Sequence, residues 1–205
     1  MLICSMYILD ELLNFPPVNQ ADDHGLLAIG GDLSTDRLLL AYKSGIFPWY
    51  EEGQPILWYA PNPRMVLLFD HLKISKSMRQ LLRKKLFTVT INTCFRKVIT
   101  QCASINRKGQ QGTWITSDMI EAYTELHSQG HALSVEVWQN DKLVGGLYGI
   151  DLKKEKIFCG ESMFSLVSNA SKIAFYYSAH YFKNKNYKLI DCQMHNDHLE
   201  SLGCI

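Results

Sequence analysis

The sequence predicts an α/β protein of the α+β type, with a small N-terminal α+β region followed by a larger region built on a sheet. Three observations lead to this class. Turn-forming residues crowd the first sixty positions, alternating strand patterns joined by short turns begin at Leu133, and amphipathic helical patterns separate the other strands. The 205 residues are enough for one large domain or two small ones.

The composition is that of an ordinary soluble protein, with 47% hydrophobic and 20% charged residues. No apolar run approaches the roughly 20 residues that span a bilayer, so we expect no membrane association. The opening MLICSMYILDELL lacks a basic n-region and carries two acids, which argues against a signal peptide. Six cysteines without a Cys-x-x-Cys pair favour the reducing cytoplasm. At a net charge of +1, a nucleic-acid partner would have to bind a local patch.

The first region is divided by turn signals. They are FPP at 15–17, the glycine pair at 30–31, GIFPW at 45–49 and APNPR at 60–64. Between them, residues 34–43 predict a short helix with Ser34 or Thr35 as its N-cap and Gly45 just past its end. We place a boundary after Pro63, which gives an N-terminal domain of residues 1–63 and a second domain of residues 64–205.

The second domain begins with a predicted strand over 65–69 and a predicted helix over 74–86. The apolar face of this helix consists of Ile74, Met78, Leu81 and Leu82. The basic face consists of Lys76, Arg79 and Arg83, with Lys84 beside it. A strand over 87–91 and a helix over 116–127, with Ser117 as a candidate cap, are expected next.

A meander follows. Strands are predicted over 133–138, 143–150 and 156–159, joined by polar turns. A helix capped by Ser168 or Asn169 is then expected to run to about Lys183, followed by a final strand over 188–194.

The final strand carries the sharpest chemical signal. Alternation places Leu189, Asp191 and Gln193 on one face and Ile190, Cys192 and Met194 on the other. Glu161 is the only charge in FCGESMFS (158–165), which we interpret as a turn at the mouth of the third strand. If the strands are neighbours, Glu161, Asp191 and Gln193 converge at one end of a sheet. Spacing alone leaves open a structural alternative, in which Asp191 accepts backbone N–H groups and Glu161 lies in a surface turn.

Other candidate sites are weaker. The glycines at 145, 146 and 149 lie inside a strand that no helix follows, which disfavours a phosphate loop. The pairs His127/His131 and His195/His198 lack a third ligand, and we expect no metal. The basic helix face is more often simply solvated, and the loop aromatics, including Trp49 and Trp114, are by default core residues. Stacking on a nucleic-acid base is their functional alternative.

A set of ordered motifs covers nearly the whole chain. They are GLLAIGGDLS (25–34), RLLLAY (37–42), GIFPW (45–49), PILW (55–58), PNPR (61–64), GTWI (112–115), VGGLYG (144–149), FCGESMFS (158–165), NASK (169–172), LIDCQ (189–193) and HLESLG (198–203). In this order and spacing the chain resembles the bacterial leucyl/phenylalanyl-tRNA–protein transferases.

The resemblance implies a small N-terminal domain and a GNAT-like acyltransferase domain with a mixed, mostly antiparallel central sheet. It implies transfer of Leu or Phe (or Met) from aminoacyl-tRNA to a protein that begins with Arg or Lys, which creates an N-terminal degradation signal. An aminoacyl ester is already activated, so no cofactor is expected. The expected enzyme is a cytoplasmic monomer.

The resemblance also assigns roles. Asp191, Gln193 and Glu161 would be catalytic: Asp191 would orient Gln193, and Gln193 would accept a hydrogen bond from the attacking amine. Glu161 and Asp191 are also expected to attract the cationic acceptor. The donor side-chain pocket would be formed by Leu147, Phe158, Met163 and Phe175. Trp49 or Trp114 would stack on the 3′-adenosine, and the tRNA phosphates would meet Lys76, Arg79, Arg83 and Lys84.

The sequence departs from the family at a few positions. Leu133 stands where histidine is common, and Leu147 stands where methionine is common, which could retune the pocket. One rival is a CoA-dependent N-acetyltransferase, which would need a glycine-containing pyrophosphate turn where this chain has GESMFSLVSNAS. A second rival, a noncatalytic RNA-binding module, leaves Glu161, Asp191 and Gln193 unexplained.

Overall fold

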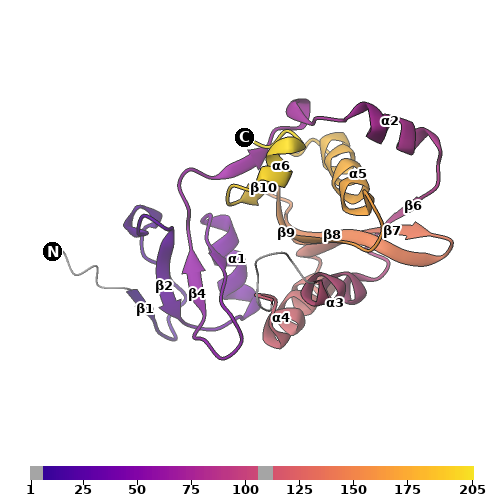
Figure 1. Cartoon of the computed structure of the whole chain (residues 1–205). Coiled ribbons are helices and arrows are strands. Elements are labelled where there is room, and N and C mark those ends of the chain that lie inside the picture. The colour runs from indigo at the N-terminus through magenta and orange to yellow at the C-terminus, as the bar shows by residue number, and fades with distance from the viewer. Residues whose placement is uncertain (1–6, 106–112) are drawn as a thin grey trace.

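A computed structural model describes residues 7–105 and 113–205 (Figure 1). It contains two sheets with helices packed around them. The strands of the first sheet lie within residues 7–59, and those of the second lie within residues 65–193. No helix in the described part of the chain is long and apolar enough to cross a membrane.

The first sheet has four short strands in the order β1-β2-β4-β3. They are β1 (Tyr7–Leu9), β2 (Leu26–Gly30), β3 (Phe47–Pro48) and β4 (Leu57–Tyr59). Helix α1 (Thr35–Lys43) joins β2 to β3, and a 3-10 turn, η1 (Val18–Gln20), precedes β2. The Ser34 hydroxyl accepts the N–H of Arg37 and caps α1, as the sequence predicts.

The second sheet has six strands in the order β5-β10-β9-β8-β7-β6. They are β5 (Met65–Leu67), β6 (Thr88–Ile91), β7 (Ala132–Gln139), β8 (Lys142–Leu152), β9 (Ile157–Ser165) and β10 (Leu189–Gln193). All neighbouring pairs are antiparallel except β9 and β10, which are parallel. The expected mixed, mostly antiparallel central sheet is therefore confirmed.

Helices cover both faces of this sheet (Figure 1). One face packs against α5 (Ala170–Asn184) and the apolar side of α2 (Lys76–Arg83). The other face packs against α3 (Phe95–Ser104) and α4 (Ser117–Ser128), and this core continues into α1 and the first sheet. Helix α6 (Asp197–Ser201) follows β10, and a second 3-10 turn, η2 (Phe69–His71), follows β5. The two sheets thus share one core, and the boundary after Pro63 stays a prediction.

The structure corrects several expected elements. Helix α3 is missing from our sequence prediction, although Phe95, Val98, Ile99 and Cys102 have helical spacing and are buried. Strand β9 is longer than expected and includes all of FCGESMFS, so this segment is strand and not a turn. Helix α2 is shorter than expected at both ends: Ser75 caps its start at Lys76, and it ends at Arg83. The N-cap of α4 is Thr116 and not Ser117.

The glycines of β8 serve close packing. A Cβ atom on Gly145 would lie 2.5 Å from the Cβ of Ala170, and one on Gly149 would lie 2.1 Å from the carbonyl oxygen of Cys159. Neither position has room for a side chain, so these glycines let α5 and β9 approach β8.

Candidate active site

The candidate site begins where β9 and β10 stop pairing. Their parallel ladder ends at the Asp191–Cys159 pair. Just beyond it, each strand carries a β-bulge against its other neighbour. In the pairing of β8 with β9, Tyr148 opposes Ser162 and Gly149 opposes Gly160, which leaves Glu161 as the extra residue of β9. In β10 the register shifts between Asp191 and Gln193. Bulges re-aim side chains and are frequent beside active sites.

The bulges bring Glu161 and Gln193 together from the two strands. The Gln193 side-chain Nε2 donates to Glu161 Oε1 at 2.6 Å. Since the amide nitrogen faces the carboxylate, the amide carbonyl oxygen of Gln193 remains as an acceptor for another group. Gln193 adopts a positive φ of 65°, an uncommon conformation for a residue other than glycine.

The hydroxyls of two tyrosines lie beside the Glu161 carboxylate. Tyr123 of α4 donates to Glu161 Oε2 at 3.3 Å, and it shares a short hydrogen bond with Tyr42 of α1. Burial raises the pKa of Glu161 to about 7, although hydrogen bonds from Tyr42, Tyr123 and Gln193 favour the ionised form, and the charge of Asp191 raises the pKa further. A carboxyl group with this pKa can exchange a proton near neutral pH.

The hydroxyls of both tyrosines remain hydrogen-bond donors at the pH values where Glu161 titrates. Burial, with the charge of Glu161 as the next cause, raises the pKa of Tyr42 and that of Tyr123 well above their usual value. Both hydroxyls are therefore protonated at neutral pH. They act as fixed hydrogen-bond donors around a carboxyl group that can titrate.

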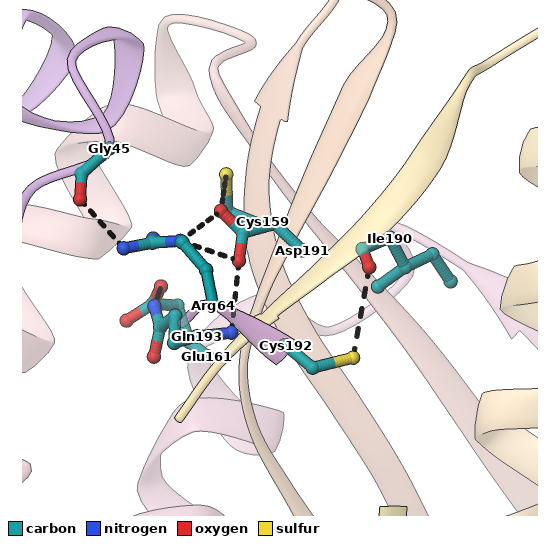
Figure 2. A network of polar contacts seen from close by, with 8 residues as sticks. All are labelled: Gly45, Arg64, Cys159, Glu161, Ile190, Asp191, Cys192 and Gln193. Carbon is teal, nitrogen blue, oxygen red and sulfur yellow. Dashed lines mark hydrogen bonds and ion pairs between the residues drawn. The ribbon is translucent and has the colours of Figure 1, made fainter. Parts of the chain in front are cut away.

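Asp191 has a different set of partners (Figure 2). Arg64 Nε lies 2.9 Å and 2.8 Å from the two carboxylate oxygens of Asp191, and Asp191 Oδ1 also accepts the backbone N–H of Gln193 at 2.9 Å. Arg64 Nη1 donates to the carbonyl oxygen of Gly45 at 2.6 Å. Asp191 therefore orients Gln193 through its backbone, and its charge is balanced by Arg64.

Two cysteines border this network. Cys159 Sγ lies 3.9 Å from Asp191 Oδ2, and burial followed by the charge of Asp191 raises the pKa of this thiol well above its usual value. Cys192 points away from Cys159 and donates to the carbonyl oxygen of Ile190 at 3.8 Å (Figure 2). Its sulfur also lies 3.6 Å from that of Cys204. Cys192 lines both the pocket and the cleft described below, and its hydrogen bond with Cys204, followed by burial, raises the pKa of its thiol well above its usual value. Buried, protonated thiols are poor nucleophiles, so the chemistry of the site belongs to the oxygen and amide groups.

A cavity of about 100 Å³ opens beside Gln193 and Glu161. The four residues expected to form a donor pocket all line it: Leu147, Phe158, Met163 and Phe175. Ile190 and Leu199 complete its apolar wall. The cavity is thus a mainly apolar pocket with a few polar groups, which belong to Glu161, Gln193, Tyr148, Ser162 and Ser178, as is common for small-molecule sites.

A larger cleft of about 570 Å³ adjoins this pocket and shares Glu161, Met163 and Gln193 with it. Trp49, after β3, and Trp114, before α4, both line the cleft and are only partly buried. Phe47 lies beside them, and Tyr59 contacts Trp49 at a ring-centroid distance of 5.6 Å. The two expected stacking residues therefore border the same cleft as Glu161 and Gln193. With Asp191, these two residues form what we call the polar cluster.

The expected phosphate contacts lie elsewhere. Lys76, Arg79, Arg83 and Lys84 are exposed on or next to α2, on the far side of α5 from the first sheet (Figure 1). None of them lines the pocket or the cleft. The structure confirms the apolar and basic faces of α2, but it does not bring the basic face to the polar cluster.

One group in the described residues has the spacing of metal ligands. His195, Asp197 and Glu200 are exposed around α6, and their ligand atoms lie within 4.8 Å of one another. The ring of His195 contacts Glu200 at 3.2 Å. Neither His127 nor His198 belongs to it; His127 bonds to the carbonyl oxygen of Ala132 and stacks on Phe95.

Sequence reasoning missed three residues of the site. Arg64, Tyr42 and Tyr123 all lie far along the chain from the residues they contact. Each lies in a pattern that the sequence explains by folding alone, a turn for Arg64 and helices for the tyrosines. A buried acid needs donors, and that requirement signals that such partners exist. Tyr42 and Arg64 also lie in two of the motifs that carry the resemblance, RLLLAY and PNPR.

The chain matches known proteins over almost its full length. The profile of a family described as leucyl/phenylalanyl-tRNA protein transferase matches residues 66–205, and that of its N-terminal domain matches residues 31–62. A leucyl/phenylalanyl-tRNA–protein transferase of Flavobacterium johnsoniae is 66% identical over 97% of this chain and 93% of its own length. The one from Flavobacterium psychrophilum is 60% identical with the same coverage.

Solved structures show weaker likeness. The structure of L-PGS from Bacillus licheniformis matches with a TM-score of 0.45 and 12% identity, over 83% of this chain and 54% of that one. An aminoglycoside acetyltransferase from a soil metagenome matches with a TM-score of 0.39 and 14% identity, over 56% of this chain and 83% of that one.

Proposed function

Because the chain belongs to the leucyl/phenylalanyl-tRNA–protein transferase family, we propose that it moves leucine or phenylalanine, or methionine, from aminoacyl-tRNA to the α-amine of an acceptor protein that begins with Arg or Lys. The family and its aminoacyltransferase class agree with the resemblance found in the sequence. One observation carries the proposal. The apolar pocket and the cleft lined by the two tryptophans adjoin each other, and the Glu161–Gln193 pair lines both.

The two parts of this space suit the two ends of the donor. The apolar pocket, lined by Leu147, Phe158, Met163 and Phe175, suits an uncharged side chain. Trp49 and Trp114 offer ring faces on which the 3′-terminal adenosine can stack, and such stacking contributes about 1–3 kcal/mol per base. The ester carbonyl then lies between the pocket and the tryptophans, beside Gln193.

The reaction forms one amide bond and breaks one ester bond. The neutral amine attacks the ester carbonyl, the ribose oxygen leaves, and the proton that the amine loses ends on that oxygen. An α-amine has a pKa of about 7.7–8.0, so a large fraction arrives as ammonium and must first lose another proton. Holding amine and ester together contributes much of the rate, and the site must also accept that first proton.

Glu161 and Gln193 divide this work. Gln193, fixed by Glu161 through its Nε2 atom, presents its carbonyl oxygen to the amine. Glu161, with its pKa raised to about 7, accepts the proton from the ammonium group, because the two pKa values are close. Asp191 orients Gln193 through the backbone N–H.

The attraction for a cationic acceptor falls to Glu161. Arg64 already balances the charge of Asp191, whereas Glu161 has only neutral hydrogen-bond partners among the described residues. The ionised Glu161 therefore draws the ammonium group of the acceptor toward the ester.

The tRNA body would reach a second surface. Lys76, Arg79, Arg83 and Lys84 present an exposed basic face on α2, outside the cleft that receives the tRNA end. Phosphates of the acceptor stem would bind there, and binding would weaken with salt. We further propose that the enzyme works as a cytoplasmic monomer and that the added residue marks the acceptor for degradation.

The transfer assay tests the function directly. The purified chain is incubated with charged Leu-tRNA, Phe-tRNA or Met-tRNA and a peptide that begins with Arg, and peptide mass is measured. We expect elongation by one donor residue, and none with an N-acetylated copy of the peptide. The proposal is overturned if the peptide is elongated with none of the three charged tRNAs. It is also overturned if the peptide is acetylated when acetyl-CoA replaces the tRNAs.

Site variants test the residues. Single-turnover transfer by Asp191→Ala, Glu161→Ala and Gln193→Ala should be slower by about 100-fold or more, as is usual when a group that positions or deprotonates the nucleophile is lost. If all three variants kept rates near that of the parent, the reaction would have to occur elsewhere on the protein.

A further inference from the structure

Arg64 joins the two halves of the molecule at the candidate site. It directly follows the Asn62–Pro63 pair and makes contacts in both directions. Toward the second sheet it meets both carboxylate oxygens of Asp191, at 2.9 and 2.8 Å. Toward the first sheet its Nη1 donates to the carbonyl oxygen of Gly45 (Figure 2). Its guanidinium also lies 5.3 Å from the ring centre of Phe47.

The contact with Asp191 reaches the reacting groups in two further steps. The same Asp191 oxygen that accepts from Arg64 also accepts the backbone N–H of Gln193. That bond holds Gln193 at its positive φ in the bulge, and the bulge turns the Gln193 amide toward Glu161. Arg64 therefore fixes one end of a chain of hydrogen bonds that finishes at the Gln193 side chain.

The contacts with the first sheet reach the other side of the cleft. Gly45 and Phe47 lie in the same GIFPW segment as Trp49, and Phe47 and Trp49 both line the cleft. A displacement of this segment would move the surface on which a base can stack. The Arg64 guanidinium thus contacts two groups. One is the segment that carries Trp49, and the other is the carboxylate of Asp191, which orients Gln193.

We propose that Arg64 is a positioning residue for the transfer reaction, which couples the placement of the segment carrying Trp49 to the orientation of Gln193 and balances the charge of Asp191 beside Glu161. The inference rests on the proposed transfer activity. Arg64 itself touches no reacting atom; it acts through Asp191 and through Gly45.

The charge balance gives a readout that a purely structural role would not change. Glu161 faces Tyr42 of α1, Tyr123 of α4, Tyr148 of β8 and Asp191 of β10, with Cys159 on its own strand. Asp191 raises the pKa of Glu161 because the two charges are alike. Without Arg64 the Asp191 charge is no longer offset, so the pKa of Glu161 should rise further. The pH midpoint at which the transfer rate increases should then lie higher than in the parent.

The first sheet contains a matched control. Arg37 also joins an aspartate to a distant backbone carbonyl: its Nε lies 3.2 Å from Asp32 Oδ2 and its Nη2 donates to the carbonyl oxygen of Asp10 at 2.8 Å. Its side chain is only 1% exposed, so its loss should cost stability at least as much as the loss of Arg64. Arg37 has no contact with the polar cluster.

The experiment compares Arg64→Lys, Arg64→Met and Arg37→Met in single-turnover transfer of leucine to an Arg-starting peptide, with rates corrected for the folded fraction. For Arg64→Met we expect a loss of about 100-fold in the maximal rate, the size of effect that a misplacement of about 1 Å causes, with a pH midpoint above that of the parent. For Arg64→Lys, which keeps the charge but not the fork geometry, we expect about a tenfold loss with the parental midpoint.

For Arg37→Met we expect the parental rate and midpoint. The proposal is overturned if Arg64→Lys reacts as fast as the parent, or if Arg37→Met loses as much rate as the Arg64 variants. Arg64→Lys decides the matter even where Arg64→Met fails to fold. Failure of the proposed function is seen separately, as an unmodified parent protein that elongates no peptide.

Discussion

Two glutamates of the same sheet, Glu136 and Glu161, differ in how far they are removed from solvent and in the groups that surround them. Glu136 of β7 is fully buried and accepts five hydrogen bonds, from the hydroxyls of Thr90, Thr93 and Ser134 and from the backbone N–H groups of Thr93 and Cys94. Glu161 of β9 lies at a bulge on the cleft, held by the Gln193 amide and by tyrosine hydroxyls.

The difference separates a carboxylate that serves the fold from one that serves chemistry. An ionised carboxylate offers about four lone-pair sites, and the neighbours of Glu136 occupy them all. Its bonds to the segment before α3 fix the start of that helix. Glu161 receives fewer donors and keeps contact with the cleft, and burial accordingly raises its pKa to about 7.

The largest effect that the comparison predicts is on stability, at Glu136. We expect Glu136→Ala to lower the free energy of unfolding by about 3 kcal/mol, because several buried donors lose their acceptor. For a chain of this size that corresponds to a fall in melting temperature on the order of 10 °C. Urea unfolding and thermal melts measure it, with the exposed Glu125→Ala as the control.

The folded fraction of Glu136→Ala should transfer at the parental rate. A loss of the reaction at full folding would mean that both glutamates serve the chemistry, and the distinction between them would fail. Stability close to that of the parent would show that its hydrogen bonds do not fix the start of α3.

A second effect concerns Glu161 and the pH dependence of stability. Its folded pKa of about 7 lies above the usual 4.5, so its contribution to stability is complete below pH 4.5 and is lost as the pH rises through 7. Relative to Glu161→Gln, the parent should therefore lose up to about 3 kcal/mol between pH 4.5 and 8.5. Urea unfolding of both proteins across this range measures the difference.

A constant difference between the two proteins would contradict the raised pKa. Groups other than Glu161 titrate in both proteins, so their contributions cancel when the two stability curves are subtracted.

The smallest effect concerns the apolar side of the site. Met163 lines both the pocket and the cleft. Met163→Ala should enlarge the pocket and favour phenylalanine over leucine by about tenfold, since pockets of this kind discriminate by about 1–3 kcal/mol per methylene. A competition between Leu-tRNA and Phe-tRNA for one peptide gives the ratio.

Val144→Ala provides the control for this variant. Val144 belongs to the same core but does not line the pocket, so its truncation should leave the ratio unchanged. An unchanged ratio in Met163→Ala would place the donor side chain elsewhere.

Periodicity in the sequence was sufficient for most of the fold. The meander, α1, α5 and the last strand follow from local patterns, and alternation correctly places Ile190 and Cys192 in one core. It is wrong for Gln193, which was expected on the face of Asp191: the register shifts between these two residues, and Gln193 lines the same cavity as Ile190 and Cys192. The four pocket residues were named from the family resemblance, and the structure places all four around one cavity. Their role in the reaction stays a prediction.

The polar partners could not be read from local patterns. A bulge adds one residue to a strand without a compositional mark, so FCGESMFS, a bulged strand around Glu161, was interpreted as a turn. Arg64 contacts Asp191 across 127 positions, and Tyr42 contacts Tyr123 across 81. Contacts between such distant positions depend on how the two sheets pack, which a single sequence does not display.

The most direct test of the account is the ratio of the single-turnover transfer rates of the parent and Glu161→Gln between pH 5.5 and 8.5. Both proteins use the same acceptor amine, but only the parent can take the proton from its ammonium form. If Glu161 accepts that proton, the ratio is about 100 or more while the amine is largely ammonium. It then falls as the pH rises through the amine pKa of about 7.7–8.0, because free amine needs no proton acceptor. A ratio that is close to one, or that does not change with pH, would contradict the role assigned to Glu161.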